Sequence, residues 1–213
     1  MKDNFRKYTT EFIGTFFLVF TVGCTILFGQ PGVIPAIAIG GALMVMVYAG
    51  GKISGGHYNP AVSLAAVLRG SLSSHELIPY WIAQILGALA AAFLLSQMVL
   101  PPIFNDIITY ETTGLIIGEF LFTFALCYVV LLTATSEDTI GNSYYGLAIG
   151  AVLTVGIFAV GGAVCYGAFN PAVAIGLGKM YIADWSLVVL TILANILAGF
   201  VAAFVYKYLK NIY

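Results

Sequence analysis

The sequence predicts an all-α membrane protein in which six helices cross the bilayer and two shorter helices enter it only partway. Two observations lead to this fold class. Hydrophobic residues make up 61% of the 213 residues and charged residues only 8%, a balance that one soluble core of this size could not bury. The tetrapeptide Asn-Pro-Ala-Val also occurs twice, at 59–62 and at 170–173, once in each apolar half of the chain.

Six stretches are long enough to cross a bilayer, which takes about 20 predominantly apolar residues as a helix. Three stretches lie in each half, and turn residues or charged residues separate them. The first stretch has no small-residue cleavage pattern, so we expect it to be a retained span and not a signal peptide. The expected spans cover residues 9–29, 33–51, 77–99, 114–134, 144–162 and 185–207.

An internal repeat relates the two halves of the chain. The Asn-Pro-Ala-Val motif recurs after 111 positions, and a Glu-Phe-x-x-Thr-Phe segment that begins at Glu11 recurs at Glu119, 108 positions later. We therefore expect a single transmembrane domain over 1–213, built from a first repeat at 1–103 and a second at 104–213. Because three spans is an odd number, the second repeat is expected to lie upside down relative to the first.

Two further apolar stretches, 59–69 and 170–179, are too short to cross the membrane. Each opens on Asn-Pro, in which Asn caps a helix and Pro occupies its first turn. In inverted halves these helices enter from opposite faces, so their first turns meet near the midplane. Irregular backbone survives at this depth only when it is packed in protein or lines a watery cavity, which predicts a pore. The motif residues are Asn59, Pro60, Ala61, Asn170, Pro171 and Ala172.

The paired helix starts predict a passage for neutral molecules. Each helix N-terminus carries roughly half a positive charge, and two of them aimed at one point oppose cations and protons. The Asn59 and Asn170 amides can donate hydrogen bonds to a passing oxygen. The glycines before each motif let the backbone run extended, so that its carbonyls offer acceptors along the wall.

The charged residues predict an orientation in which both termini are cytoplasmic, because basic residues concentrate on the cytoplasmic side of membrane proteins. The opposite side has one lysine, Lys179, together with Asp106, Glu111 and Asp184. The basic residues on the expected cytoplasmic side are Lys2, Arg6, Lys7, Lys52, Arg69, Lys207 and Lys210.

These features resemble the major intrinsic protein family, which comprises the aquaporins and aquaglyceroporins. The resemblance rests on the segment 54–62, on the second Asn-Pro-Ala, on both Glu-x-x-x-Thr segments and on the six-plus-two hydropathy pattern. It implies a homotetramer in the plasma membrane in which each subunit passes water or small uncharged solutes through its own single-file pore, with no cofactor. It also implies that Glu11 and Glu119 brace the two loops. By the same resemblance, the pore-lining loops include Gly55, Gly56, His57 and Ala168.

The chain departs from the family pattern at the outer constriction. Most members have an Arg directly after the second Asn-Pro-Ala, where this chain has Val173. By analogy, the other constriction residues are Ile39, Phe158 and Gly167. Such a filter has no fixed charge and no side-chain hydrogen-bond donor, which disfavours water. The alternative reading is therefore a channel for larger neutral solutes such as glycerol, metalloid hydroxides, hydrogen peroxide or ammonia, with poor water flux.

Other function classes fit the sequence less well. An enzyme would need a paired acid and base, a nucleophile with its base, or metal ligands, and the two intramembrane glutamates are isolated from each other and related by the repeat. A coupled transporter would need titratable groups at the midplane, where this chain has amides. The net charge of -1 argues against nucleic acid. A non-conducting scaffold of the same family stays open, as does a pH gate at His57.

Overall fold

A computed structural model describes residues 2–30, 32–98 and 107–211. The expected boundary between the repeats, at 103 and 104, lies outside these residues. Within them the chain forms eight α-helices and no β-strand, so the prediction of an all-helical fold is confirmed. The helices are α1 (Lys2–Leu27), α2 (Ile34–Ser54), α3 (Pro60–Arg69), α4 (Leu77–Met98), α5 (Thr112–Ala134), α6 (Tyr145–Ala159), α7 (Pro171–Lys179) and α8 (Trp185–Leu209).

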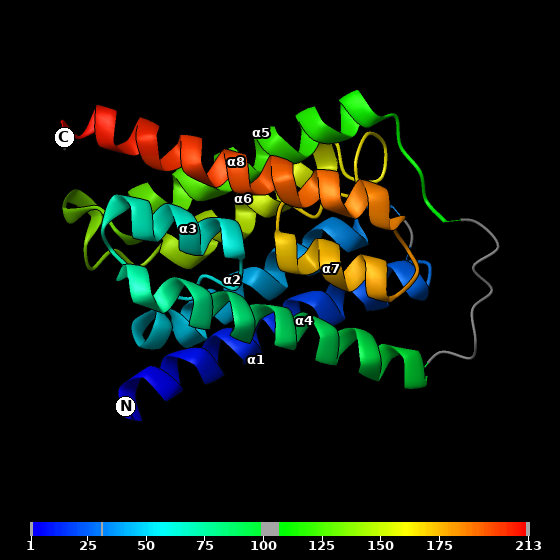
Figure 1. The fold of residues 1–213 in the computed structure, drawn as a ribbon, viewed down its shortest axis with the longest axis horizontal. Coiled ribbons are helices and arrows are strands. Elements are labelled where there is room, and N and C mark those ends of the chain that lie inside the picture. Colours follow the sequence, from blue (N-terminus) through cyan, green and yellow to red (C-terminus); the bar gives the residue numbers. More distant parts are fainter. Residues whose placement is uncertain (1, 31, 99–106, 212–213) are drawn as a thin grey trace.

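The helices pack in matched pairs. In the first half α1 packs against α4, and in the second half α5 packs against α8, while α2 and α6 pack against each other between the halves. Each short helix packs on a long helix of the other half: α3 packs on α8, and α7 packs on α4. Figure 1 shows α3 and α7 end to end between the long helices, with both chain termini at the same end of the bundle.

Among the described residues, five helices are long and apolar enough to cross a membrane, and the sixth expected span is shorter than predicted. Residues 144–162 were expected to form one span, whereas α6 has 15 residues and is about 22 Å long at 1.5 Å per residue. The helix ends at Ala159 because Gly161 and Gly162 turn the chain back. Gly162 takes a φ of 75°, and its N–H donates to the Cys165 carbonyl at 2.9 Å. An irregular loop therefore continues where α6 stops.

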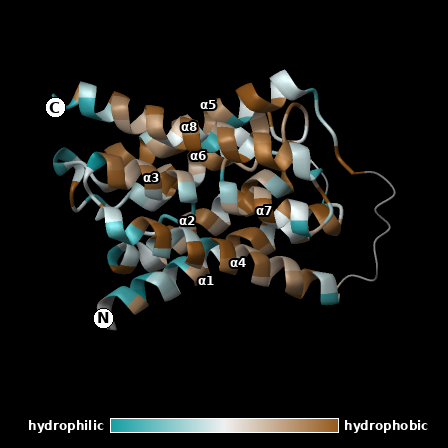
Figure 2. Cartoon of the chain, viewed as in Figure 1, coloured by the Kyte–Doolittle hydropathy of each residue, from teal (hydrophilic) through white to brown (hydrophobic). Residues whose placement is uncertain are grey.

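The outer surface of the bundle suits a lipid environment. Large apolar side chains are exposed along the long helices, including Leu193, Leu197, Phe200 and Phe204 of α8. Figure 2 shows the hydrophobic residues over the middle of the bundle and hydrophilic residues toward its ends, including the end that carries both termini. The chain is thus apolar both inside and on its flanks, as expected of a protein dissolved in a bilayer.

Glycines allow close contacts between helices, as two of them illustrate. A Cβ atom at Gly87 of α4 would lie 2.4 Å from the Phe12 carbonyl oxygen of α1. A Cβ atom at Gly199 of α8 would lie 2.6 Å from the Ala61 carbonyl oxygen in the first turn of α3. Small residues permit such approach between helices in a membrane, and the Gly199 contact holds α3 directly against α8.

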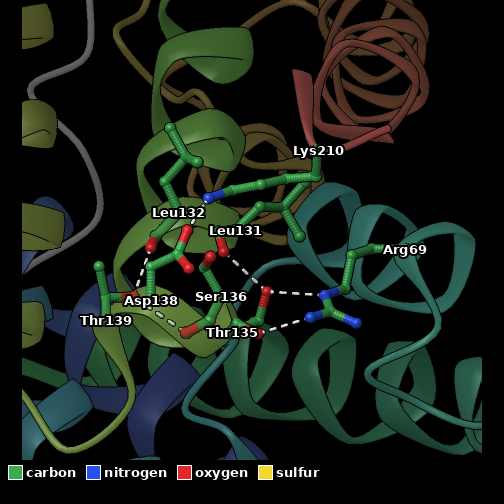
Figure 3. Close-up of polar contacts among 8 residues, drawn as sticks. All are labelled: Arg69, Leu131, Leu132, Thr135, Ser136, Asp138, Thr139 and Lys210. Atoms are coloured by element: carbon green, nitrogen blue, oxygen red, sulfur yellow. Dashed lines mark hydrogen bonds and ion pairs between the residues drawn. The ribbon is translucent and has the colours of Figure 1, made fainter. Parts of the chain in front are cut away.

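Polar contacts fasten the loop between α5 and α6 at the end where the termini lie (Figure 3). The Arg69 guanidinium, at the end of α3, donates from Nε to Thr135 Oγ1 at 3.1 Å and from Nη2 to the Thr135 carbonyl at 2.7 Å. The same guanidinium lies over the Tyr206 ring of α8, 5.3 Å from its centroid. Lys210 forms an ion pair with Asp138 of the loop. The last turns of α3, α5 and α8 are therefore joined.

Candidate transport pore

The two asparagines of the repeated motif cap α3 and α7 and join them. Each side-chain Oδ1 accepts the N–H of the second residue after it, Ala61 or Ala172, at 2.9 Å. The Asn59 Nδ2 atom donates to the Phe169 carbonyl at 2.9 Å, and the Asn170 Nδ2 atom donates to the Tyr58 carbonyl at 2.8 Å. Each cap therefore also bonds the loop that precedes the other cap.

The residues that receive these bonds have left-handed backbone. Tyr58 has a φ of 50° and Phe169 a φ of 45°, values that are uncommon for residues with bulky side chains. Such conformations persist where the surroundings determine them on several sides. Here the carbonyl of each residue accepts an asparagine amide, and the N–H of each donates to a buried glutamate.

Glu11 of α1 accepts hydrogen bonds from the first loop, from the end of α2 and from α4. Its Oε1 accepts from Ser54 Oγ at 2.6 Å and from the His57 N–H at 3.0 Å. Its Oε2 accepts from the Tyr58 N–H at 2.6 Å and from Gln84 Nε2 of α4 at 2.8 Å. The carboxylate is fully buried, and all four partners are donors, which offsets the cost of removing it from water.

Glu119 of α5 has the equivalent place in the second loop. Its Oε1 accepts from the Ala168 N–H at 3.0 Å, and its Oε2 accepts from the Phe169 N–H at 2.8 Å. Asn195 of α8 donates from Nδ2 to Glu119 Oε2 at 3.1 Å and to Thr123 Oγ1 at 2.8 Å. The structure thus places both glutamates against the loops that the sequence assigned to them.

A narrow cavity runs past the joined caps, with a volume of about 10 Å³. This volume is close to the smallest that holds one water molecule. Three of the four expected constriction residues, Ile39, Gly167 and Val173, line this cavity. The other lining residues are Leu18, Val22, Leu43, His57, Asn59, Val62, Leu126, Val130, Ile149, Leu153, Ala168 and Asn170.

A wide vestibule of about 1070 Å³ opens at one end of the narrow cavity. His57 and Val130 line both spaces, so they mark the place where the vestibule narrows. The vestibule wall carries the basic residues Lys7, Lys52 and Arg69. Together the two spaces form a funnel with a charged wide end and an apolar narrow end.

Phe158, the expected constriction residue of the fifth span, does not line the narrow cavity. Its side chain is 52% exposed, and the cavity wall on α6 is formed by Ile149 and Leu153 instead. Ile157 is the residue of α6 beside Gly167, since a Cβ atom at Gly167 would lie 3.6 Å from Ile157 Cγ1. Counting without gaps therefore misses Ile157 by one position.

Some of the other expected pore residues line the narrow cavity or the vestibule, and the rest are buried behind them. Gly55 lines the vestibule, while Ala168 lines the narrow cavity. Gly56 lines neither space; it has a φ of 63° and lies against the backbone of α2. The prolines and alanines of the two motifs are buried in the first turns of α3 and α7, where they support the caps without reaching the lumen.

The sequence reasoning missed Gln84 and Asn195, although both contact a bracing glutamate. They are separated by 111 positions, the same interval that separates Asn59 from Asn170. That interval was the available signal, because a polar side chain at matching positions of two apolar spans is costly in lipid and so indicates a polar partner. One amide is a glutamine and the other an asparagine, so a search for identical residues does not find the pair.

Comparison with known proteins decides the family. The family model for the major intrinsic proteins matches residues 1–206. The chain belongs to the major intrinsic protein family. Members of this family are channels and not enzymes, and this chain is an integral, multi-pass membrane protein.

Relatives of this major intrinsic protein include a protein named as a glycerol uptake facilitator and proteins named as aquaporins. It is 36% identical over 179 residues to glycerol uptake facilitator protein-like 6 of Lactiplantibacillus plantarum, covering 80% of this chain and 82% of that protein. It is 36% identical over 193 residues to aquaporin TIP2-1 of Arabidopsis thaliana, covering 81% and 77%. The structure matches that of the aquaglyceroporin from Plasmodium falciparum with a TM-score of 0.78 at 22% identity, covering 96% of both chains, which confirms the aquaporin-like fold.

Proposed function

We propose that this protein is a passive channel for water and small uncharged solutes, which cross in single file past Asn59 and Asn170. The observation that carries the proposal is the pair of reciprocal bonds between these caps and the loops beside them. Each Nδ2 atom has two hydrogens and donates one of them to a backbone carbonyl. The second hydrogen of each amide is then available to an oxygen in the narrow cavity that both residues line.

The electrostatics of the narrow cavity support uncharged cargo. None of its lining residues within the described part of the chain is Asp, Glu, Lys or Arg. The N-termini of α3 and α7 bring partial positive charge to the same place, which repels cations and protons. A neutral molecule meets no such barrier, provided that the asparagine amides and the backbone carbonyls replace its bonds to water.

Larger neutral solutes are a second candidate cargo, favoured by the residues beside the second motif. Ile39, Gly167 and Val173 all line the narrow cavity and offer apolar contact without a side-chain donor. Such a wall suits a solute with carbon on one side. The narrow cavity of about 10 Å³ favours water in the conformation described, so a larger solute requires the aliphatic side chains to move aside.

We also propose a plasma-membrane location with cytoplasmic termini and a homotetrameric assembly. Both termini lie at one end of the bundle, and the vestibule there carries Lys7, Lys52 and Arg69. Basic residues of this kind are typical of the cytoplasmic side. The apolar side chains exposed on the long helices supply surface for contacts with lipid or with neighbouring subunits.

Flux into liposomes tests the proposal. The purified protein is reconstituted, and stopped-flow light scattering measures shrinkage in an impermeant osmolyte and re-swelling in glycerol, beside empty liposomes. A channel gives flux that does not saturate with solute concentration and needs no ion gradient. Saturation or a requirement for an ion gradient indicates a transporter, and flux equal to that of empty liposomes overturns the proposal and favours a scaffold.

A further inference from the structure

The wall of the narrow cavity is built twice from the same residues. Its lining residues pair at the intervals of the internal repeat, which are 108 positions between α1 and α5, 110 between α2 and α6, and 111 between the motif loops. The pairs of identical residues are Leu18 and Leu126, Val22 and Val130, Ile39 and Ile149, Leu43 and Leu153, Asn59 and Asn170, and Val62 and Val173. Among the described lining residues that pair in this way, only His57 and Ala168 differ in type.

The two helices that carry the paired isoleucines touch at matching residues. A Cβ atom at Gly40 of α2 would lie 2.7 Å from the Gly150 carbonyl oxygen, and a Cβ atom at Gly150 of α6 would lie 2.5 Å from the Gly40 carbonyl oxygen. Gly40 also faces Thr154, whereas Gly150 faces Met44, so the helices run antiparallel where they touch. Because each glycine directly follows a cavity isoleucine, this contact determines where the isoleucines lie.

The two isoleucines lie toward opposite ends of the narrow cavity. In the antiparallel register Ile149 is level with Val45, which is six residues beyond Ile39, or about 9 Å at about 1.5 Å per residue. Tyr48 of α2 and Tyr145 of α6, whose ring centroids are 5.3 Å apart, both line the vestibule. Ile149 is therefore on the vestibule side of the helix contact, and Ile39 is on the side away from the vestibule.

The valines that follow the two motifs divide in the same way. Val62 and Val173 lie in the first turns of α3 and α7, which meet end to end (Figure 1). From this meeting point α3 leads toward the vestibule, because Arg69 at its end lines the vestibule wall. Val62 is therefore on the vestibule side together with Ile149, and Val173 is on the other side together with Ile39.

We propose that Ile149 and Val62 form a second apolar constriction on the vestibule side of the asparagine caps, equivalent to the one at Ile39 and Val173. The inference rests on the proposed channel function and adds two residues that determine its specificity. An Arg at position 173 would make the two ends of the cavity differ, whereas the Val makes them alike. An uncharged solute must then give up bonds to water twice, once on each side of the caps.

Two equal constrictions in series have a kinetic signature. Each contributes half of the resistance to flux, so widening one of them can raise the permeability by at most about twofold. Widening both lowers both barriers, and the rate then rises exponentially with the reduction in barrier height. A channel with one dominant constriction behaves differently, because widening that constriction alone gives the full increase.

Glycerol permeability of widened variants in liposomes tests the proposal. We expect Ile39→Ala and Ile149→Ala each to raise it by up to about twofold, and the double variant to exceed the product of the single effects, about fourfold. The matched controls are Ile37→Ala and Leu147→Ala, which are 58% and 55% exposed and are also 110 positions apart. Both controls should conduct like the wild type.

The milder pair Ile39→Val and Ile149→Val guards against loss of folding and should show the same pattern with smaller effects. If Ile149→Ala changes glycerol permeability neither in the wild type nor in Ile39→Ala, the second constriction does not exist. A wild type that conducts neither water nor glycerol overturns the channel function. In that case flux in the double variant, with none in either single variant, still supports two constrictions, and a closed double variant overturns them.

Discussion

Asn59 donates a 2.9 Å hydrogen bond from its amide nitrogen to the backbone carbonyl of Phe169, which lies 110 positions further along the chain. Asn170 returns the same bond to Tyr58. Two short helices that belong to different halves are thereby locked tip to tip. The position of each cap depends on the loop of the other half. We therefore expect a substitution at either cap to disturb the loops of both halves.

Substituting Ser for Asn59 should separate capping from cross-linking. Serine is a good helix cap, but its side chain is too short to reach the Phe169 carbonyl. The lost bond leaves a buried acceptor unsatisfied, so we expect Asn59→Ser to lower the free energy of unfolding by about 1–3 kcal/mol and to reduce water flux. Denaturant unfolding in detergent and liposome shrinkage measure the two effects. Wild-type stability in Asn59→Ser would show that the cross-link contributes nothing.

The contact between α3 and α8 should tolerate no additional atom. In Gly199→Ala the new Cβ atom would lie 2.6 Å from the Ala61 carbonyl oxygen, so α3 must move away from α8 and take the Asn59 cap with it. We expect a loss of about 1–3 kcal/mol in unfolding free energy together with reduced flux. The matched control is Gly41→Ala, since a Cβ atom at Gly41 meets nothing within 4 Å. Equal effects of the two variants would contradict the packing account.

Removing the charge of Glu119 should loosen the second loop. The carboxylate accepts the N–H groups of Ala168 and Phe169, and the amide of Glu119→Gln can accept through only one of its two atoms. Hydrogen bonds to charged groups contribute about 1.5–3 kcal/mol, so we expect a loss of that order in unfolding free energy. Glu137→Gln, in the loop after α5, serves as the control. A thermal transition as high in Glu119→Gln as in Glu137→Gln would show that the carboxylate does not brace the loop.

Acid should weaken the start of α5 through Glu111. The Gly114 N–H donates to the Glu111 side chain at 2.8 Å, and this bond, followed by one from the Thr113 backbone, lowers the pKa of the exposed carboxyl. A lowered pKa in the folded state means that the stabilisation is present above the unfolded pKa and is lost as the pH falls through the folded pKa. Thermal transitions of wild type and Glu111→Gln should therefore differ at neutral pH and converge in acid. A difference that grows in acid would contradict the assignment.

The repeat made the centre of the molecule predictable from the sequence, because Asn59 and Asn170 occur in identical tetrapeptides and the inversion follows from an odd number of spans. The fifth span was less predictable. Counting along the chain without gaps carries no information on the rotation of α6, so it reached Phe158, which is 52% exposed, instead of the neighbouring Ile157, which lies beside Gly167. Gln84 escaped notice because its partner in the repeat, Asn195, is a different amide.

Permeability of Val173→Arg tests the central claim most directly, that neutral solutes pass the joined asparagine caps through an apolar constriction. Liposomes with wild type, Val173→Arg or the uncharged, long-chain control Val173→Met are compared for water and glycerol flux. We predict that wild type conducts at least one of the two, and that Val173→Arg lowers glycerol flux by roughly tenfold, an effect of about 1.4 kcal/mol, well beyond the loss in Val173→Met. Unchanged flux of every solute in Val173→Arg would contradict the account.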